Sequence, residues 1–379
     1  MRRIKLCDIC DFQGGSQPPK NQWIDSPQYG YIRMLQIRDF TQSEKVKPEY
    51  IKITSSSKVC NEDDILIARY GASVGKILTG LAGAYNVAIM KTIPDEEKIS
   101  KRFLFYFLSS QYFQNYIMNV GSRAAQAGFN KDDLQGISLK EYSLKEQADI
   151  CSILDEINVI IKKRKKQLKY IENVVKSRFI ELFGDPVNNP FGFEKQILKN
   201  TCKIITGNTP SRAVGEYYGD YIEWIKTDNI VTGLLNPTKA TEYLSKKGVD
   251  AGRTVEKNSI LMACIAGSIE SIGRVCITNR TVSFNQQINA LVPAKYNVLF
   301  LYVLLQISKD YLVKDINMAL KGILSKSRLE GKEFIVPPIE LQNQFANFIA
   351  QTDKSKLAVQ KSLDELETLK KSLMQEYFG

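Results

Sequence analysis

The chain carries one long sequence pattern twice. Shifting the sequence by about 190 to 199 residues aligns local features in the same order along both halves. The matched pairs include Leu6 and Leu198, Cys10 and Cys202, Gly15 and Gly207, Pro18 and Pro210, Asp39 and Asn229, Asn86 and Asn285, Phe103 and Phe300, and Phe183 and Phe378. A repeat of this length is a whole domain rather than a solenoid unit. The sequence therefore predicts two domains of one fold and an internal pseudo-twofold repeat.

The composition is that of an ordinary globular protein. The 379 residues, 44% hydrophobic and 25% charged, are enough for at least two separate cores. No apolar run approaches the length of a membrane span, and the first residues lead into no signal-peptide core, so we expect no membrane association. Seven cysteines, an odd number, do not indicate a disulfide framework. A reducing cytoplasm is the expected compartment.

The charge balance favours an anionic partner and disfavours imidazole chemistry. A net charge of +11 is compatible with nucleic-acid binding, although many soluble proteins are equally rich in lysine. The chain contains no histidine, which removes the commonest general base, the commonest metal ligand and every imidazole triad. Carboxylate chemistry remains open, but a self-sufficient hydrolase becomes less expected.

Each half divides into a mixed region and a long helix. Short alternating runs predict strands at 51–54 and 65–68, and again around 221–225, 260–265 and 274–278. Each set is followed by a predicted helix, at 100–119 and at 298–312. We therefore expect an α+β fold, in which two mixed α/β domains, 1–142 and 185–338, are separated by two long helical segments, 143–184 and 339–379.

The two long helices carry the pattern of a coiled coil. Apolar residues recur at alternating spacings of four and three residues, the a/d repeat of a helix-pairing seam. The expected seam consists of Ile150, Leu154, Ile157, Ile161, Leu168, Ile171, Val175 and Leu182 in the first helix, and Phe345, Ile349, Val359, Leu363, Leu366, Leu373 and Tyr377 in the second. Antiparallel pairing is expected, since it lets a pseudo-twofold axis relate the halves. The alternative is that each helix packs only on its own domain.

Several short motifs resemble catalytic or cofactor sites but are incomplete. Gly71–Lys76 is one residue short of a phosphate loop, and Ile77 stands where Ser or Thr would bind magnesium, so a basic turn between strands is expected. Cys7 and Cys10 have zinc-knuckle spacing without a second pair, and Cys10 fits an apolar helix position better. Asn188–Phe191 lacks the second proline of the adenine-methyltransferase motif. We therefore predict no catalytic, cofactor-binding or metal-binding residue in this chain.

Basic and amide side chains gather in the repeated loops of both halves. Arg and Lys suit guanine edges and phosphates, and Asn and Gln suit adenine edges, so these loops are candidate DNA contacts. The candidates are Ser16, Gln17, Lys20, Arg33, Arg38, Arg69, Lys76, Arg123, Gln126, Asn130 and Lys131 in the first half, and Thr209, Ser211, Arg212, Lys226, Asp228, Asn229, Arg274, Gln286, Gln287, Lys321 and Lys326 in the second. The basic run 162–166 on the first long helix is expected to be a solvated helix face, with phosphate contact as the alternative.

The order of these features resembles the specificity subunits of type I restriction-modification systems over essentially the whole chain. Gly207-Asn208-Thr209-Pro210-Ser211 is similar to the first loop of a target recognition domain in that family. Glu181–Pro186 is similar to the family's helix exit, and Val336–Gln344 to the start of its second helix. Two positions depart from the pattern: Glu141-Tyr142 replaces Pro-Pro, and residues 14–18 read Gly-Gly-Ser-Gln-Pro instead of ending in Thr-Pro-Ser.

The resemblance implies a non-catalytic, DNA-binding subunit. Each target recognition domain would read one half of a bipartite site in double-stranded DNA, and the helices would set the gap between the halves. The partners implied are two modification (methyltransferase) subunits and the restriction (translocase and endonuclease) subunits, which would carry S-adenosylmethionine, ATP and magnesium. A stand-alone DNA methyltransferase or nuclease with fused recognition domains is the alternative function. A purely structural coiled-coil scaffold would explain the helices but not the repeated polar loops.

Overall fold

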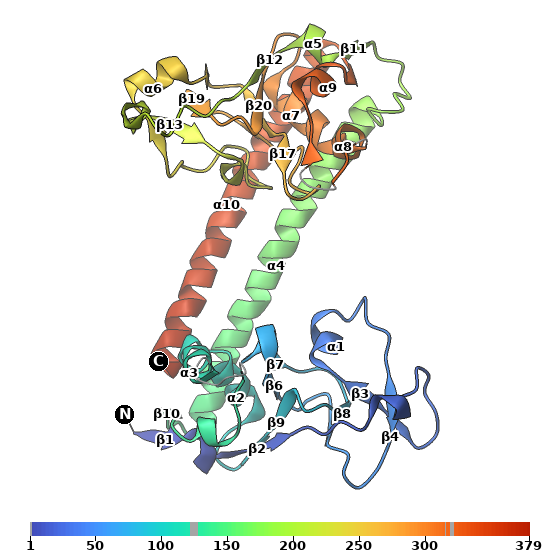
Figure 1. Ribbon diagram of the computed structural model, residues 1–379, viewed down its shortest axis with the longest axis vertical. Coiled ribbons are helices and arrows are strands. Elements are labelled where there is room, and N and C mark those ends of the chain that lie inside the picture. The colour runs from blue at the N-terminus through green and yellow to red at the C-terminus, as the bar shows by residue number, and fades with distance from the viewer. Residues whose placement is uncertain (1, 122–127, 315, 319–321) are drawn as a thin grey trace. The chain divides into compact units, whose positions relative to one another are not determined.

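The computed structural model describes residues 2–121, 128–314, 316–318 and 322–379. The chain divides into two compact units. Unit 1 contains Met1–Lys165 and Lys361–Gly379, and unit 2 contains Lys166–Gln360. The limits of these units lie inside the two long helices, α4 (Leu144–Phe183) and α10 (Ile339–Phe378), so each unit holds part of both (Figure 1). Both helices lie within the predicted segments 143–184 and 339–379.

Unit 1 is built on two four-stranded sheets and one short strand pair. The strand pair is β1 (Arg3–Lys5) with β10 (Ser138–Lys140). The first sheet has the order β2 (Cys10–Gly14), β9 (Ile89–Pro94), β6 (Leu66–Ala68) and β7 (Ile77–Leu78). The second has the order β4 (Tyr50–Lys52), β3 (Tyr31–Leu35), β8 (Gly83–Tyr85) and β5 (Val59–Cys60). Its helices are α1 (Ile37–Thr41), α2 (Lys101–Leu108) and α3 (Gln111–Gly121).

Unit 2 repeats this order strand for strand. Its strand pair is β11 (Lys195–Ile197) with β22 (Glu333–Ile335). Its sheets are β12 (Cys202–Thr206), β20 (Ile288–Pro293), β16 (Ile260–Ala263) and β18 (Val275–Ile277), and then β14 (Tyr243–Leu244), β13 (Tyr218–Ile225), β19 (Val282–Phe284) and β15 (Thr254–Val255). The parallel pairing also recurs, as Met34 with Ala84 and Trp224 with Ser283. The predicted internal repeat is confirmed by this shared topology.

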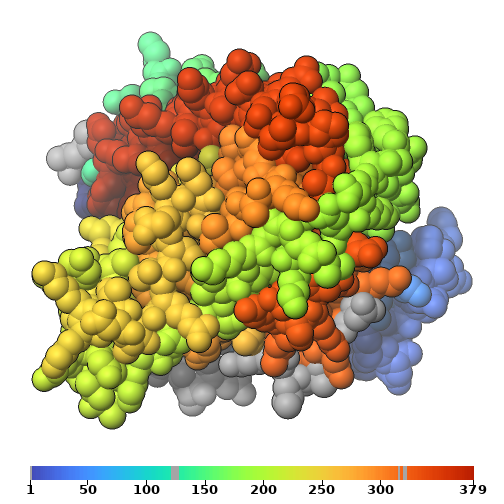
Figure 2. All heavy atoms as spheres, turned by 90° about the horizontal axis from the view of Figure 1, so that it is seen from above, coloured from blue at the N-terminus to red at the C-terminus, as the bar shows by residue number. Residues whose placement is uncertain are grey.

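Unit 2 has elements beyond the shared set. A further strand pair joins β17 (Ile265–Ala266) to β21 (Gly322–Ile323). Its helices are α5 (Leu198–Thr201), α6 (Lys246–Ala251), α7 (Val298–Ile307), α8 (Lys309–Val313) and α9 (Lys326–Glu330). In the space-filling view, atoms of α10 in red lie beside the orange atoms of the α7 region, in agreement with the packing of Phe300 against Phe345 (Figure 2).

Four local predictions need correction. The expected strand 51–54 is β4, Tyr50–Lys52, and so ends two residues earlier. The expected helices 100–119 and 298–312 are each two helices, broken near Ser110 and at Ser308. At the first break the Ser110 hydroxyl accepts a hydrogen bond from the N–H of Phe113, a local contact that competes with the helix ladder. Cys10 lies at the start of a strand rather than in a helix, since the side chains of β2 alternate between buried and exposed.

The antiparallel pairing of the long helices is visible within each unit separately. In unit 1, Ile150 and Leu154 near the start of α4 share a core with Phe378 at the end of α10, and Lys165 Nζ lies 2.8 Å from Glu367 Oε1. In unit 2, the end of α4 packs against the beginning of α10. There, Phe179 and Phe183 contact Phe345, and Lys356 Nζ lies 3.1 Å from Glu172 Oε1. All the expected seam residues are buried or partly buried.

Both mixed domains are attached to a long helix by the same buried amide. In unit 1, Gln147 Oε1 accepts a hydrogen bond from the N–H of Ser100, the N-cap of α2, at 2.9 Å. In unit 2, Gln342 Oε1 accepts one from the N–H of Asn297, the N-cap of α7, also at 2.9 Å. The amide groups of Gln147 and Gln342 also donate to backbone carbonyls, that of Gln342 to Pro337 O. A buried amide whose polar atoms are hydrogen-bonded favours one orientation of the mixed domain on the long helix, because any other orientation would leave those atoms unpaired.

One glycine is required at the same place in each unit. A Cβ atom on Gly15 would lie 2.1 Å from the carbonyl oxygen of Asn86, and one on Gly207 would lie 2.2 Å from that of Asn285. These contacts are with backbone, which cannot rotate away as a side chain could. The glycines therefore let the loop after β2 or β12 pass directly over the end of β8 or β19.

We expect Gly207→Ala to lower the free energy of unfolding of unit 2 by about 2–3 kcal/mol, because the added methyl group must displace backbone. Urea unfolding followed by fluorescence measures this loss. Gly215→Ala is the matched control, since a Cβ atom there would meet nothing within 4 Å. Equal stability of the two variants would contradict the steric explanation.

Candidate nucleic-acid interface

A glutamate holds two cations at one surface of unit 1. Glu49 directly precedes β4, and its Oε1 atom lies 2.5 Å from Lys20 Nζ. Its Oε2 atom lies 2.8 Å from Arg38 Nη2. Lys20 Nζ also stands 3.9 Å from the centre of the Trp23 ring, a cation–π contact. We call Glu49, Lys20, Arg38 and Trp23 the Glu49 cluster. Hydrogen bonding from Lys20, with the nearby positive charges, lowers the pKa of Glu49.

Unit 2 builds the same arrangement around Glu242, which directly precedes β14. Arg212 Nη2 lies 2.5 Å from Glu242 Oε2, and Lys226 Nζ pairs with Glu242 Oε1. Both cations stand near the Trp224 ring, at 5.4 Å for Arg212 and 5.2 Å for Lys226, measured to the ring centre. We call these four residues the Glu242 cluster. Hydrogen bonding from Lys226 is the largest cause of the lowered pKa of Glu242.

The two clusters occupy equivalent places in the fold. The carbonyl of Glu49 accepts from the N–H of Met34 in β3 at 2.7 Å, and that of Glu242 accepts from the N–H of Trp224 in β13 at 3.0 Å. One cation of each cluster comes from the loop after β2 or β12, and the other from the segment after β3 or β13. Sequence reasoning selected the four cations but missed both glutamates, because it looked only for donors that read bases. The repeated Glu-Tyr dipeptide at 49–50 and 242–243 was the available signal.

Several other candidates are used by the fold itself. Arg33 Nη2 pairs at 2.8 Å with the buried carboxylate of Asp39. Asn229 is also buried, and its Oδ1 atom accepts from the N–H of Lys226, as Asp39 Oδ2 accepts from that of Gln36. The remaining contacts within a unit are Arg69 Nε to Phe129 O, Arg274 Nη2 to Thr227 O, Asn130 Oδ1 with the N–H of Asp132, and Lys131 with Asp11. These candidates therefore have partners within their own unit, and their contact with DNA stays a prediction.

The other candidates lie at the surface or outside the described residues. Ser16 and Gln287 are partly buried, and each accepts a hydrogen bond from within its own unit. Thr209 donates to Gln286, and both are exposed. The exposed remainder is Gln17, Lys76, Ser211, Asp228 and Lys326. Lys76 follows a turn between β6 and β7, as predicted for Gly71–Lys76. Arg123, Gln126 and Lys321 fall outside the residues that the structure describes.

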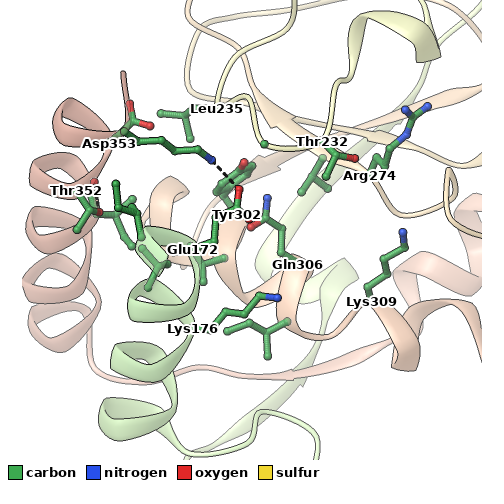
Figure 3. Close-up of a pocket in the computed structure, with 18 of the residues that line it drawn as sticks. Glu172, Lys176, Thr232, Leu235, Arg274, Tyr302, Gln306, Lys309, Thr352 and Asp353 are labelled. Atoms are coloured by element: carbon green, nitrogen blue, oxygen red, sulfur yellow. Dashed lines mark hydrogen bonds and ion pairs between the residues drawn. The ribbon is translucent and has the colours of Figure 1, made fainter. Parts of the chain in front are cut away.

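Unit 2 also contains a pocket of about 260 Å³ that sequence reasoning missed (Figure 3). Ile171, Val175, Tyr302 and Ile349 give it apolar walls. Its charged lining residues are Glu172, Lys176, Arg274, Lys309, Asp353 and Lys356. Burial raises the pKa of Asp353, while Lys356 opposes the shift.

The two repeats differ at one position of this lining. In unit 1, Tyr106 on α2 bonds to Asp155, with Tyr106 Oη 2.5 Å from Asp155 Oδ1. The helix register places Val303, which lines the pocket of unit 2, where Tyr106 stands. The valine side chain is shorter and apolar.

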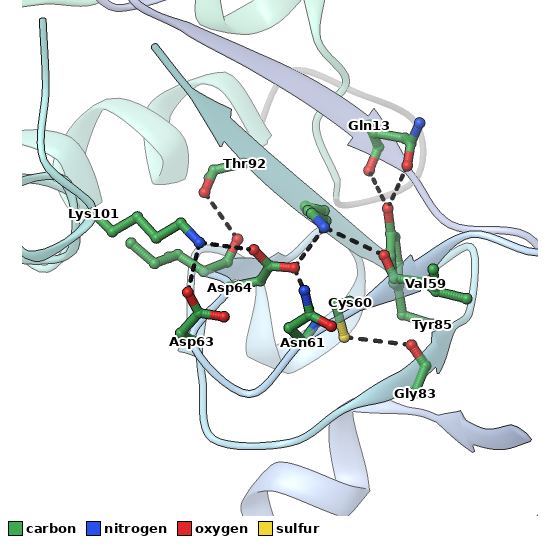
Figure 4. Close-up of polar contacts among 12 residues, drawn as sticks. Gln13, Val59, Cys60, Asn61, Asp63, Asp64, Gly83, Tyr85, Thr92 and Lys101 are labelled. Carbon is green, nitrogen blue, oxygen red and sulfur yellow. Dashed lines mark hydrogen bonds and ion pairs between the residues drawn. The ribbon is translucent and has the colours of Figure 1, made fainter. Parts of the chain in front are cut away.

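The second buried carboxylate of unit 1, Asp64, forms ion pairs with two lysines (Figure 4). Its Oδ2 atom lies 2.5 Å from Lys91 Nζ, and its Oδ1 atom 3.3 Å from Lys101 Nζ. Burial, the largest single influence, raises the pKa of Asp64, but the hydrogen bonds and charges of these lysines and the N–H of Asn61 lower it overall. Across the described ranges, no group of three or more Cys, Asp or Glu side chains could hold a metal ion.

The cysteines are mostly buried within the two units. All seven cysteines are unpaired, and all except Cys7 are buried. Burial raises the pKa of Cys10 to about 12, and that of Cys202 to about 12, so both thiols stay protonated at neutral pH. Among the helices that the structure describes, none is both long and apolar enough to cross a membrane.

Comparison with known proteins agrees with the repeated architecture. A family model described as the type I restriction modification DNA specificity domain matches residues 1–170 and again 190–368. The chain belongs to this family. Both copies of the repeat are matched, and together they cover most of the sequence.

Two curated relatives and one solved structure illustrate the likeness. The chain is 21% identical over 396 residues to the type I restriction enzyme MjaVIII specificity subunit of Methanocaldococcus jannaschii, covering 98% of this chain and 90% of that protein. It is 33% identical over 106 residues to the HindI specificity subunit of Haemophilus influenzae, which is 27% of this chain and 22% of that one. The crystal structure of a type I restriction-modification S subunit from M. genitalium superposes with a TM-score of 0.58 at 14% identity, covering 100% and 96% of the two chains. At that identity the superposition shows a shared fold.

Proposed function

We propose that this chain is the specificity subunit of a type I restriction-modification complex. Each unit would bind one half of a bipartite site in double-stranded DNA and so direct adenine methylation and restriction by partner subunits. The observation that carries the proposal is the match of the family to both copies of a duplicated fold. The repeated cation clusters support it, because a protein that binds two half-sites needs two equivalent surfaces.

The chemistry would belong to the partners. Two modification subunits would carry S-adenosylmethionine, and restriction subunits would use ATP and magnesium, all in the cytoplasm. This chain would be non-catalytic by itself. Within the described residues, the buried carboxylates Asp39 and Asp64 serve internal contacts. The alternative, a stand-alone methyltransferase or nuclease, predicts stoichiometric binding of labelled S-adenosylmethionine or divalent metal to the purified chain, and either result would contradict the proposal.

The function is tested by sequencing methylated adenine in DNA from cells that carry a cognate modification subunit with and without this chain. We expect one bipartite motif to be methylated only when the chain is present. A mark that persists without the chain would show that specificity resides elsewhere. Absence of the mark in both strains would count against this chain as the determinant for that partner.

The long helices carry an exposed apolar side chain at a matching position in each unit. Val174 on α4 in unit 2 and Leu369 on α10 in unit 1 occupy matching positions of the repeat, and their side chains are 51% and 48% exposed. Tyr170 lies beside Val174 in a shallow hollow, whereas the other residues of the hollow at Leu369 are charged or polar. Exposed apolar residues on a paired helix commonly mark a protein-binding surface. The two matching positions support docking of two modification subunits.

We expect Val174→Asp and Leu369→Asp each to remove one modification subunit from the complex, since a buried unpaired carboxylate would be strongly unfavourable at the contact. Native mass spectrometry of the assembled complex would count the subunits. Ile53→Asp changes a residue that is 51% exposed and lies outside the helices, and it is the matched control. Full assembly of the double variant would rule out these positions as docking sites.

A further inference from the structure

We infer that the Glu49 and Glu242 clusters are a matched pair of contacts to the sugar–phosphate backbone, and that base reading is left to the parts in which the two units differ. This inference rests on the proposed function. It assigns a specific role to residues that otherwise belong to a broad set of candidates.

The clusters are kept in both units while their surroundings have changed. Each cluster has one carboxylate, two cations and an indole, and the carboxylate and its exposed cation, Lys20 or Arg212, stand at equivalent positions of the repeat. A neighbouring element has diverged: α6 follows β14 directly in unit 2, whereas β4 in unit 1 is followed by the strand β5 with no helix between them. Two half-sites of different sequence share only the backbone. A feature that both units share is therefore expected to contact the sugar–phosphate backbone, and features that differ between the units are expected to contact the bases.

The exposed cation differs in type between the clusters. Lys20 in unit 1 corresponds to Arg212 in unit 2. The second cations come from different positions of the repeat, because Lys226 corresponds to Gln36 rather than to Arg38. Arginine and lysine are not interchangeable in a bidentate contact to a guanine edge, because only the guanidinium presents two parallel donors. They are interchangeable as positive charges facing a phosphate. The change from Lys20 to Arg212 thus favours phosphate recognition.

The charge and exposure of the clusters also suit a phosphate. Two cations and one carboxylate leave a formal charge of +1 on each cluster. The side chains of Lys20 and Arg212 are 60% and 59% exposed, whereas those of Glu49 and Glu242 are 24% and 31% exposed. The carboxylate thus lies beneath the exposed cation and holds it in one place, which reduces the conformational entropy lost when a phosphate binds.

The experiment measures how DNA binding depends on salt. The complex of this chain with its modification subunits is titrated by fluorescence anisotropy against labelled duplexes of several unrelated sequences, at a series of KCl concentrations. Each neutralised phosphate contributes a slope of about −0.9 to log Kobs against log[KCl]. We expect Arg212→Gln to reduce the slope by roughly 0.9 on every duplex, because it removes the net positive charge of the Glu242 cluster. The same holds for Lys20→Gln in the Glu49 cluster.

Lys199→Gln is the matched control. This substitution removes an exposed charge from α5, which precedes β12, whereas Arg212 lies beyond the opposite end of that strand. The salt slope of the Lys199→Gln complex should therefore equal that of the unsubstituted complex. Methylome sequencing of the cluster variants should return the original motif at lower occupancy. A motif that loses one specified base would overturn the inference and make the cluster a base reader. An unchanged slope would also overturn it. If the unsubstituted complex neither binds DNA nor methylates it, the proposed function fails as well.

Discussion

Duplicating one heptad in each long helix is expected to widen the gap of the recognised DNA site by about three base pairs while both half-sites stay the same. Seven helical residues add about 10.5 Å, and consecutive base pairs are about 3.4 Å apart. A whole heptad preserves the phase of the seam, so the helices still pair. Residues 159–165 in α4 and 354–360 in α10 are equivalent in the repeat and suit the duplication. Methylome sequencing reads the gap directly.

Exchanging the two heptads without changing helix length is the control for this experiment. The exchange changes the same residues but keeps the length of each helix, so it shows whether a change of sequence alone alters the gap. The original gap should remain. An unchanged gap in the duplicated variant, with methylation retained, would contradict the idea that helix length sets the spacing. Because one base pair rotates the duplex by about 34°, a change of three also turns the second half-site by roughly 100°.

Replacing Phe183 by alanine is expected to lower the free energy of unfolding of unit 2 by about 3–5 kcal/mol, a large part of the stability of a typical domain. Phe183 is fully buried at the end of α4. Its ring centre lies 4.8 Å from that of Phe300 and 5.5 Å from that of Phe345. Alanine would leave a cavity among three elements that all depend on this ring.

Tryptophan fluorescence can follow this unit alone. The chain has two tryptophans, Trp23 in unit 1 and Trp224 in unit 2. In a Trp23→Phe background, urea unfolding monitored by Trp224 reports on unit 2. Phe191→Ala is the control, because that side chain is 56% exposed and its loss should change stability by about 0.5 kcal/mol or less. A loss below about 1 kcal/mol for Phe183→Ala would show that the core tolerates its absence.

The fold was predictable where the signal was long or repeated. The seam spacing located α4 and α10 closely, because a heptad pattern sustained over many residues is compatible with few structures besides paired helices. The duplication predicted one topology used twice, which the sheets confirm. Short elements were less predictable. Cys10 was expected in a helix and lies in β2, because a run of a few residues cannot distinguish the roughly 3.6-residue period of a helix from the two-residue period of a strand.

The candidate site was only partly predictable. Residue type drew attention to Lys20, Arg38, Arg212 and Lys226, which the structure places in the two clusters, but the same criterion selected Asn229, which the fold uses internally. The glutamates lie directly before strands, 29 residues beyond Lys20 and 30 residues beyond Arg212 in the chain. Which distant side chains meet depends on strand pairing, and a local pattern does not contain that information.

The sequence by itself determined the duplication, the two paired helices and the presence of basic residues in the repeated loops. These features follow from the spacing and order of residues along the chain, so they can be recognised before any contact is known. Only the tertiary structure decided which cations share a glutamate, which candidates have partners within their own unit, and where unit 2 has a pocket. The reason is physical: burial and electrostatic pairing depend on distances across the fold, and the sheets bring together residues that lie far apart in the chain.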